Sequence, residues 1–338
     1  MRHMIRRNDG HTIMDNKDIQ KEIQRKTSIP LLIANVTLVG FVVSFGFMIY
    51  KTRQEKPVVA LAPKKMDTSA FDHMDVQAQS IFVWDINKDQ SIYAKNENVV
   101  RPLASITKIM SAITALSILP KNSPITINKE FLAEEGDSGL YVNEQWNFKN
   151  LLDFSLMVSS NDGIHSIAAV AGAFASGQNM ENPDYNIGLN DFISKMNQKA
   201  AVIGLSSLHF NNETGLDVTA DESGGYGSAE DVAKLIEYAM KNYPDVLEVT
   251  KNKTEVFSSL EKTHDAVNTD EAISKIPNLI ASKTGYTSLS GGNLAVVFDA
   301  GVGRPIAIVV LDSTYDGRFT DVEQLASSTL RYIQDNNL

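Results

Sequence analysis

The stretch "PLASITKIM", residues 102–110, places a serine and a lysine one helical turn apart in an otherwise apolar segment. Apolar residues recur downstream at helical spacing, which predicts a helix over 105–119 that ends before Pro120. Ser105 and Lys108 lie three positions apart, so a helix presents both side chains on one face within hydrogen-bonding reach. A helix built only for packing would carry alanine and leucine there, so the pair needs a further explanation.

Chemistry offers one explanation for this pair. A serine hydroxyl is a weak nucleophile, and a neighbouring lysine whose amine is held neutral can take its proton. A backbone N–H at the start of a helix can also face a developing oxyanion. The Ser-x-x-Lys pattern alone is weak evidence, because Ser259 and Lys262 repeat it elsewhere in the chain.

Two further motifs follow in order along the chain. In "VSSNDG", Ser159 and Asn161 fall in a break between two helical patterns, where side chains can project outward. Capping of the next helix is the alternative explanation for this motif. In "SKTGYT", residues 283–285 fall in a predicted strand, where a lysine, a hydroxyl and a close-approaching glycine can bind a carboxylate.

The rest of the chain beyond residue 76 predicts an α+β fold. The runs at 78–86 and 90–95 flank a turn and predict a hairpin, and three apolar runs after Pro277 predict an antiparallel meander. Helical patterns lie between and after them, at 148–158, 162–175, 189–205, 228–243 and 319–333. We therefore expect an antiparallel sheet flanked by helices, to which the first hairpin returns, beside a helical lobe.

The N-terminal part of the chain has a different composition. Residues 31–50 carry no charge, and a helix of this length spans about 30 Å of hydrocarbon. We predict one transmembrane helix at 31–50, preceded by a cytoplasmic tail at 1–30 and followed by a linker at 51–75 and a catalytic domain at 76–338. A cleaved signal peptide is the alternative, although the polar leading segment is long and Pro63 disfavours cleavage after "ALA". The flanking Lys and Arg residues do not set the orientation.

Composition also narrows the chemistry. Cysteine is absent, which excludes disulfides, thiolate metal sites and a cysteine nucleophile. The six histidines lack the spacing of a zinc site, and His165 is better explained as a packed core histidine. Glu134 and Glu135 are adjacent and would point apart on a helix, so we interpret them as solvated surface rather than as an acid–base pair. We expect neither a metal nor another cofactor.

Charge is distributed unevenly along the chain. Residues 1–65 carry 12 basic and 5 acidic side chains, whereas the remainder carries 19 basic and 36 acidic ones. An acidic domain repels the phosphate backbone of nucleic acids. We therefore expect no nucleic-acid partner, and we interpret the basic N-terminal part as a solvated, membrane-proximal segment.

In their order, Ser-x-x-Lys, Ser-x-Asn and Lys-Thr-Gly resemble the signature of penicillin-binding proteins and serine β-lactamases. Over residues 76–335 the chain resembles the low-molecular-mass D-alanyl-D-alanine carboxypeptidases, through "ASITKIMSA", "LLDFSLMVSSNDG", "FNNETGLD", "YGSAEDVAKL" and "SKTGYTSLSGGNLAV". The resemblance implies a β-lactamase/penicillin-binding-protein-like fold, a peptidoglycan stem peptide as substrate and β-lactam antibiotics as covalent inhibitors. Because peptidoglycan lies outside the membrane, it implies a single-pass protein of the cell membrane with an extracytoplasmic catalytic domain.

The resemblance also implies roles in catalysis. Ser105 would be the acylated nucleophile and Lys108 its general base, while Ser159 would relay a proton towards the leaving amine. The backbone N–H groups of Ser105 and Tyr286 would form the oxyanion hole.

The same resemblance implies residues that bind the substrate. Asn161 would hydrogen-bond the substrate amide, Lys283 would add positive potential, and Thr284 beside Gly285 would hold the terminal carboxylate. Arg318 falls where the family places a carboxylate-binding arginine, although a surface arginine is an alternative. Two departures, Ser160 in place of a usual glycine and Glu230 in place of a usual arginine, leave the subfamily and specificity open.

Three other functions are weighed against this one. A DD-endopeptidase that cuts cross-links with the same machinery stays open, because nothing in the sequence fixes which amide is presented. A serine β-lactamase would need a glutamate that activates water, and the nearest candidate, Glu213, lies in a segment already explained by the carboxypeptidase resemblance. A non-catalytic, penicillin-binding sensor is disfavoured because residues 1–30 contain no recognisable effector domain.

Overall fold

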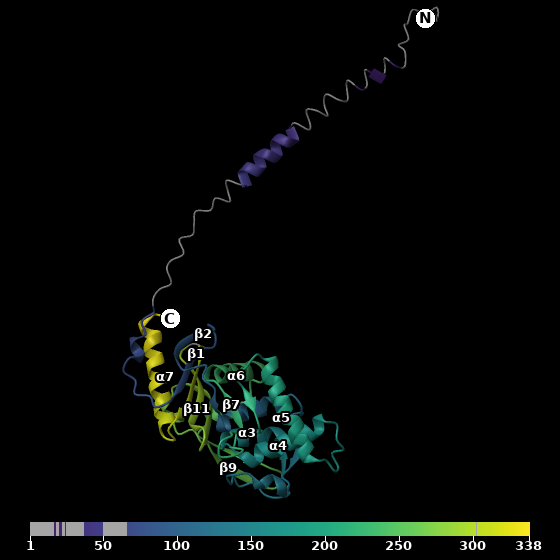
Figure 1. The fold of residues 1–338 in the computed structure, drawn as a ribbon, viewed down its shortest axis with the longest axis vertical. Helices are drawn as coiled ribbons and strands as arrows, with labels where there is room; N and C mark the ends of the chain where they lie inside the picture. Colours follow the sequence, from purple (N-terminus) through teal and green to yellow (C-terminus); the bar gives the residue numbers. More distant parts are fainter. Residues whose placement is uncertain (1–16, 18–19, 22–23, 25–36, 50–65, 302) are drawn as a thin grey trace, which may run out of the picture. The chain divides into compact units, whose positions relative to one another are not determined.

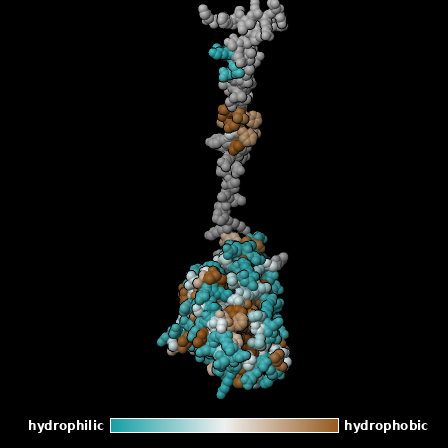
Figure 2. Space-filling view, turned by 90° about the vertical axis from the view of Figure 1, so that its right-hand side faces the viewer, coloured by the Kyte–Doolittle hydropathy of each residue, from teal (hydrophilic) through white to brown (hydrophobic). Residues whose placement is uncertain are grey.

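The computed structural model of the chain describes residues 17, 20–21, 24, 37–49, 66–301 and 303–338, and the chain divides into two units, 1–65 and 66–338. In the first unit, residues 37–49 are helical with exposed apolar side chains, coloured brown in Figure 2. Among the described residues, no helix is both long and apolar enough to cross a membrane. Residues 31–36 and 50 of the predicted anchor, most of the predicted tail at 1–30, and residues 51–65 of the predicted linker lie outside the described residues.

A five-stranded antiparallel sheet forms the centre of the second unit (Figure 1), with the strand order β10-β11-β12-β1-β2. Its strands are β1 (Ser80–Asp85), β2 (Gln90–Lys95), β10 (Leu279–Thr287), β11 (Gly291–Asp299) and β12 (Pro305–Ser313). The register of β1 on β12 places Val83 opposite Ile308. The predicted hairpin, the meander and the return of the hairpin to the sheet are thus confirmed, and the hairpin pairs with the last strand of the meander.

Helices cover both faces of this sheet. Helix α7 (Gly317–Asp335) packs on one face and α6 (Ala229–Asn242) on the other (Figure 1). Side chains alternate along a strand, so Leu294 and Val296 of β11 enter the core beneath α7, whereas Ala295 and Val297 enter the core of the helical lobe. Full burial of each larger apolar side chain contributes about 1.5–3 kcal/mol, so two cores hold the sheet in place.

The helical lobe consists of α2 (Lys108–Leu116), α3 (Phe148–Met157), α4 (Asn161–Ala175) and α5 (Tyr185–Val202), together with α6. The helix starts follow the capping rules, because Ser160 accepts from the Gly163 N–H at 3.0 Å and Ser228 accepts from the Asp231 N–H at 3.2 Å. The predicted helices are confirmed. The helix predicted over 105–119 begins instead with a 3₁₀ turn, η2 (Ala104–Thr107), that continues into α2.

Several short elements lie outside the prediction. They are β3 (Arg101–Pro102), β4 (Pro124–Thr126), β5 (Gln145–Asn147), β6 (His209–Phe210), β7 (Gly225–Gly227), β8 (Thr254–Ser258), β9 (Thr263–Val267), and the 3₁₀ turns η1 (Ser69–Phe71), η3 (Lys129–Ala133), η4 (Glu248–Lys251) and η5 (Ile273–Lys275). Elements of two to five residues are too short to show a hydrophobic period, so sequence patterns do not reveal them.

The second unit also begins earlier than the predicted boundary at residue 76. The Asp67 N–H donates to Asn336 Oδ1 at 2.9 Å, and the buried Phe71 ring stacks on Tyr93 at 4.8 Å. Residues 66–75 therefore belong to the folded unit and not to the predicted linker, because they close its core beside α7.

Candidate active site

The candidate nucleophile lies in a tight backbone turn. Ser105 sits in η2, directly after Ala104, which has a φ of +48°. Two glycines allow other segments to approach this turn: a Cβ on Gly285 would lie 2.8 Å from the Leu103 carbonyl oxygen, and one on Gly215 would lie 1.9 Å from the Ala104 carbonyl oxygen. Gly215 also has a φ of +83°, which side chains disfavour. Glycine at both positions therefore allows β10 and the 211–217 turn to pack against Ser105.

The Lys108 amine is fully buried and directed at Ser105. Its Nζ lies 2.8 Å from Ser105 Oγ, 2.6 Å from Asn161 Oδ1 and 2.8 Å from the Thr214 carbonyl oxygen. Burial disfavours the charged form and lowers the pKa of Lys108 to about 7, although the negative charges of Glu213 and Glu134 act in the opposite direction. A neutral amine can donate to Asn161 and Thr214 and still accept the Ser105 proton, which is what a general base requires.

The second motif lies between α3 and α4. Ser159 has a φ of +60°, and its hydroxyl accepts a hydrogen bond from Lys283 Nζ at 2.9 Å. Its neighbour Ser160 is buried and caps α4. The capping explanation thus holds for Ser160, whereas Asn161 is joined to Ser105 through Lys108 and Ser159 is bonded to Lys283.

The side chains of Asn161 and Thr284 are both held by hydrogen bonds within the protein. The Asn161 amide accepts from Lys108 and donates through Nδ2 to the Glu135 carbonyl oxygen at 2.5 Å. The Thr284 hydroxyl lies 2.5 Å from the Thr269 hydroxyl, which belongs to the segment after β9. These contacts hold the two side chains in defined orientations before any ligand binds.

Lys283 is the second buried lysine of the site. Its Nζ contacts the Ser159 hydroxyl and the Thr284 carbonyl oxygen at 3.0 Å. Burial and the nearby positive charges of Lys108 and Arg318 lower the pKa of Lys283 well below its usual value. An anionic ligand beside these cations would offset that repulsion, so the cluster favours a carboxylate.

Arg318 lies at the site and not on the surface. Its side chain is 3% exposed, and Nη1 donates to the Gly285 carbonyl oxygen at 2.8 Å. The guanidinium carbon lies 4.4 Å from the centre of the Tyr315 ring, and that ring packs edge-on against Tyr286 at 4.9 Å. The alternative of a surface arginine is therefore wrong. Burial lowers the pKa of Arg318, although the charge and the hydrogen bond of Tyr315 act in the opposite direction.

The third motif occupies an edge of the sheet. β10 is the last strand in the sheet order, so its free edge runs beside η2. An edge strand leaves backbone N–H groups unpaired. This is the arrangement that the predicted oxyanion hole, formed by the N–H groups of Ser105 and Tyr286, would use.

Sequence reasoning missed a pair of polar residues behind Lys108. His165 Nδ1 lies 2.7 Å from Glu213 Oε1, and Glu134 Oε1 lies 3.6 Å from the same nitrogen. Glu134, interpreted as solvated surface, is in fact only 28% exposed through its side chain. Glu213, the β-lactamase candidate, is 5% exposed and directs its carboxylate at His165.

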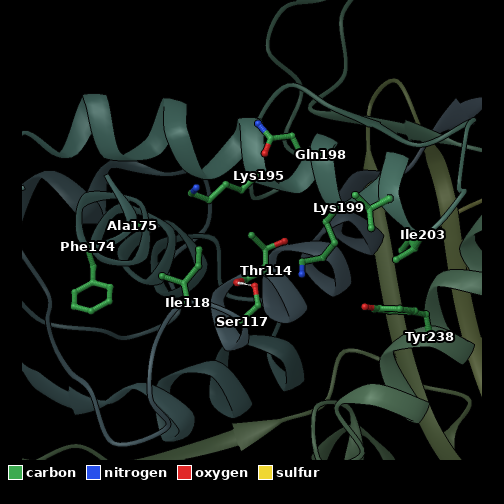
Figure 3. Close-up of a pocket in the computed structure, with 11 residues that line it drawn as sticks. Thr114, Ser117, Ile118, Phe174, Ala175, Lys195, Gln198, Lys199, Ile203 and Tyr238 are labelled. Atoms are coloured by element: carbon green, nitrogen blue, oxygen red, sulfur yellow. Dashed lines mark hydrogen bonds between the residues drawn. The ribbon is translucent and has the colours of Figure 1, made fainter. Parts of the chain in front are cut away.

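A groove elsewhere in the helical lobe contains none of the residues of this network. Figure 3 shows this groove of about 560 Å³, between the ends of α2, α4, α5 and α6, where the Lys199 amine and the Tyr238 hydroxyl project towards the Ser117 side. Its lining residues are Thr114, Ser117, Ile118, Phe174, Ala175, Lys195, Gln198, Lys199, Val202, Ile203 and Tyr238. None of them contacts Ser105, so the groove is distinct from the candidate active site.

The fold and the network agree with one family. The family model described as D-alanyl-D-alanine carboxypeptidase, peptidase S11, matches residues 65–314. The chain therefore belongs to the D-alanyl-D-alanine carboxypeptidase family of serine hydrolases.

Individual relatives support this assignment. D-alanyl-D-alanine carboxypeptidase DacB2 of Mycobacterium tuberculosis is 31% identical over 215 residues, which cover 63% of this chain and 68% of the relative. A D-alanyl-D-alanine endopeptidase of Escherichia coli is 28% identical over 254 residues, 73% of this chain and 74% of the relative. The crystal structure of a D-alanyl-D-alanine carboxypeptidase from M. tuberculosis H37Rv superposes with a TM-score of 0.66 and 26% identity, covering 78% of this chain and 92% of that one.

Proposed function

We propose that the protein is a serine-type D-Ala-D-Ala carboxypeptidase that trims peptidoglycan stem peptides through an acyl-enzyme on Ser105. The observation that carries the proposal is the contact of 2.8 Å between the buried Lys108 Nζ and Ser105 Oγ. It supplies a base, neutral near pH 7, at hydrogen-bonding distance from a hydroxyl.

Acylation follows from this geometry. The Ser105 hydroxyl transfers its proton to Lys108 as Oγ attacks the carbonyl carbon of the D-Ala-D-Ala amide. The N–H groups of Ser105 and Tyr286 stabilise the negative charge that develops on the carbonyl oxygen. The C–N bond then breaks as Ser159, held by Lys283, gives its hydroxyl proton to the departing D-alanine amine and takes up the proton that Lys108 received from Ser105, which leaves Ser159 and Lys108 neutral again. A water molecule hydrolyses the resulting ester and frees Ser105.

Substrate binding uses the remaining residues of the network. The free carboxylate of the terminal D-alanine binds beside Lys283 and the Thr284 hydroxyl, with Arg318 contributing positive charge beneath Gly285. Asn161 hydrogen-bonds the amide of the stem peptide. This arrangement favours a peptide whose carboxylate is one residue away from the cleaved bond, as in D-Ala-D-Ala.

Digestion of a stem pentapeptide by the purified protein tests this proposal. Release of one D-alanine per peptide by the wild type, and none by Ser105→Ala, is the expected result. A matched control is Ser259→Ala, which changes the other Ser-x-x-Lys of the chain and is expected to leave D-alanine release unchanged.

A DD-endopeptidase is the second candidate, because relatives 28% and 30% identical to this chain are named D-alanyl-D-alanine endopeptidase. The same residues would then attack the cross-linking amide between two stem peptides. Incubation with cross-linked muropeptide dimers separates the two functions. Monomeric products without free D-alanine would identify an endopeptidase, whereas free D-alanine and intact dimers would identify a carboxypeptidase.

β-Lactam antibiotics would acylate the same serine, because their strained amide places a carboxylate and a carbonyl as the D-Ala-D-Ala end does. A β-lactamase would release the penicilloyl group rapidly. The carboxylate of Glu213 lies against His165 and is buried, which leaves it poorly placed to activate water at Ser105. Slow loss of label after removal of free fluorescent penicillin is therefore the expected result.

We also propose a location for the protein at the cell membrane. Residues 31–50 anchor the chain in the cell membrane, and the catalytic unit acts on the extracytoplasmic side. The uncharged sequence of this stretch and the position of peptidoglycan outside the membrane support this part of the proposal. Protease added to intact spheroplasts would digest an extracytoplasmic catalytic unit, and full protection without lysis would contradict this location.

A further inference from the structure

A buried hydrogen bond joins two segments behind the Lys108 amine. His165 lies on α4, and Glu213 lies in the turn after β6. Their contact between Nδ1 and Oε1 is 2.7 Å, with side-chain exposures of 16% and 5%. The Phe131 ring packs edge-on against His165 at 5.7 Å, so the imidazole is held from a third side.

These two segments also supply the acceptors of the Lys108 amine. Asn161 precedes His165 by one helical turn on α4, and its Oδ1 accepts from Lys108 at 2.6 Å. Thr214 directly follows Glu213, and its carbonyl oxygen accepts from Lys108 at 2.8 Å. The Glu213 carbonyl oxygen in turn accepts from Ser111, one turn after Lys108 on α2, at 2.6 Å. The His165–Glu213 bond therefore spans the two elements that orient the base.

Charge around Lys108 comes from several elements. The groups that face it or its neighbours are Glu213 in the turn, Glu134 after η3, His165 and Asp162 on α4, Lys283 on β10 and Arg318 on α7. Burial alone would lower the pKa of His165, but the hydrogen bond and charge of Glu213 and the charge of Glu134 reverse this, and the net shift is upward. The carboxylates of Glu213 and Glu134 thus favour the protonated form of the imidazole.

We propose that His165 and Glu213 are positioning residues for Lys108. Their bond holds both acceptors of the Lys108 amine in place, and their charges, with that of Glu134, set the pH at which the amine becomes a base. The inference rests on the proposed roles of Ser105 and Lys108 in acylation. It assigns a function to a histidine and two glutamates that none of the three motifs contains.

The charge that each substitution removes decides whether the Lys108 amine becomes a base at lower or at higher pH. Glu213→Gln keeps a hydrogen-bonding side chain but removes a negative charge, so protonated Lys108 is less stable and the amine becomes a base at lower pH. Glu134→Gln acts in the same direction. His165→Gln removes the imidazole, whose protonated form offsets the negative charge of Glu213, so protonated Lys108 is more stable in this variant and the amine becomes a base only at higher pH.

The experiment measures the second-order rate constant of acylation by a fluorescent penicillin from pH 5 to 9, for the wild type and each variant. We expect the acid limb to move down by about one pH unit in Glu213→Gln and Glu134→Gln, and up by a similar amount in His165→Gln. Glu213→Ala, which removes the bridge, should also lower the limiting rate about tenfold or more, while Glu213→Gln stays within about threefold of the wild type. Rates are normalised to the fraction of protein that is finally labelled.

A matched control comes from the other buried histidine–glutamate pair among the described residues. His264 Nε2 lies 2.5 Å from Glu144 Oε1, and neither side chain contacts Lys108. Glu144→Gln should lower the melting temperature and leave the acid limb in place. If the Glu213 variants fold poorly, Glu134→Gln decides the charge effect, because Glu134 is partly exposed in a turn.

Two results would overturn the inference: acid limbs in all three charge variants that coincide with the wild type, or shifts of the same sign in Glu213→Gln and His165→Gln. Both results differ from failure of the proposed function. If the proposed function fails, the wild type itself is not labelled at Ser105.

Discussion

Lys283 Nζ donates a hydrogen bond to the Ser159 hydroxyl at 2.9 Å and so joins the second and third motifs across 124 positions of chain. Lys108 joins the first and second motifs in the same way, through Asn161. Hydrogen bonds thus link the second motif to each of the other two, through Asn161 to Lys108 and through Ser159 to Lys283. The Ser159 hydroxyl accepts in this contact, so its own proton points away from the Lys283 amine and can be donated to another group.

Replacement of Ser159 by alanine tests its role as a proton relay. Ser159→Ala removes the group that passes a proton to the departing amine, so we expect D-alanine release to fall by about 10²–10⁴-fold. The fold should survive, because Ser160 and not Ser159 caps α4. The readout is kcat on a stem pentapeptide, with Ser160→Ala as the control for stability. A kcat within about threefold of the wild type would remove Ser159 from the mechanism.

Acylation should depend on the protonation of Lys108. Burial lowers the pKa of this amine to about 7, and only the neutral form can take the Ser105 proton. The acylation rate constant should therefore rise about tenfold per pH unit up to roughly pH 7 and level off above it. Stopped-flow measurement with a fluorescent penicillin gives this profile. A rate constant that is flat between pH 5 and 9 would argue against Lys108 as the base.

The same buried lysine should destabilise the fold. Because folding lowers the Lys108 pKa from 10.5 to about 7, the unfolded chain binds more protons between these values, and stability rises with pH across this window. Lys108→Met removes the free-energy cost of burying the lysine amine. We expect it to raise the free energy of unfolding by about 2 kcal/mol at pH 7, with lost hydrogen bonds offsetting part of a larger gain.

Urea denaturation at pH 7 and pH 10 measures this effect. The advantage of Lys108→Met should shrink at pH 10, where the wild-type amine is neutral in the folded protein. Lys88→Met, at an exposed position, serves as the control and should change stability little at either pH. A Lys108→Met protein less stable than the wild type at pH 7 would contradict the argument.

Alanine substitutions at Gly215 and Gly204 distinguish the effect of backbone strain from that of a steric clash. Both have positive φ, +83° and +80°, so alanine at either position should cost about 1–2 kcal/mol. Only at Gly215 would the new Cβ also meet the Ala104 carbonyl oxygen, at 1.9 Å, beside the nucleophile. Gly215→Ala should therefore be less stable than Gly204→Ala and also lose acylation. Equal melting temperatures and equal labelling of the two variants would show that the turn around Ser105 adapts.

The sequence was enough to predict the sheet and the main helices, because they repeat a pattern over many residues. The apolar run of β11 and the helical stripe after Ser105 are local signals that burial directly explains. The β8–β9 hairpin has no such signal: Phe257 is the only buried residue of β8, and the buried polar His264 lies opposite it. Hairpins that bury so few apolar residues leave little trace in periodicity.

The candidate site was predicted in part. Ser105, Lys108, Ser159, Asn161 and residues 283–285 belong to motifs with fixed spacing, and the structure brings them together. Arg318 could not be placed from sequence, because its burial depends on the contact between the start of α7 and Gly285 of β10. Glu213 and His165 could not be paired either, since their contact joins residues 48 positions apart and neither residue belongs to the Ser-x-x-Lys, Ser-x-Asn or Lys-Thr-Gly motif.

Mass spectrometry of the protein after incubation with penicillin identifies the acylated residue. We expect one covalent adduct per molecule, on the tryptic peptide that contains Ser105, and no adduct in Ser105→Ala. The same wild-type protein should also release D-alanine from a stem pentapeptide. An adduct on another residue, or labelling that persists in Ser105→Ala, would contradict the account.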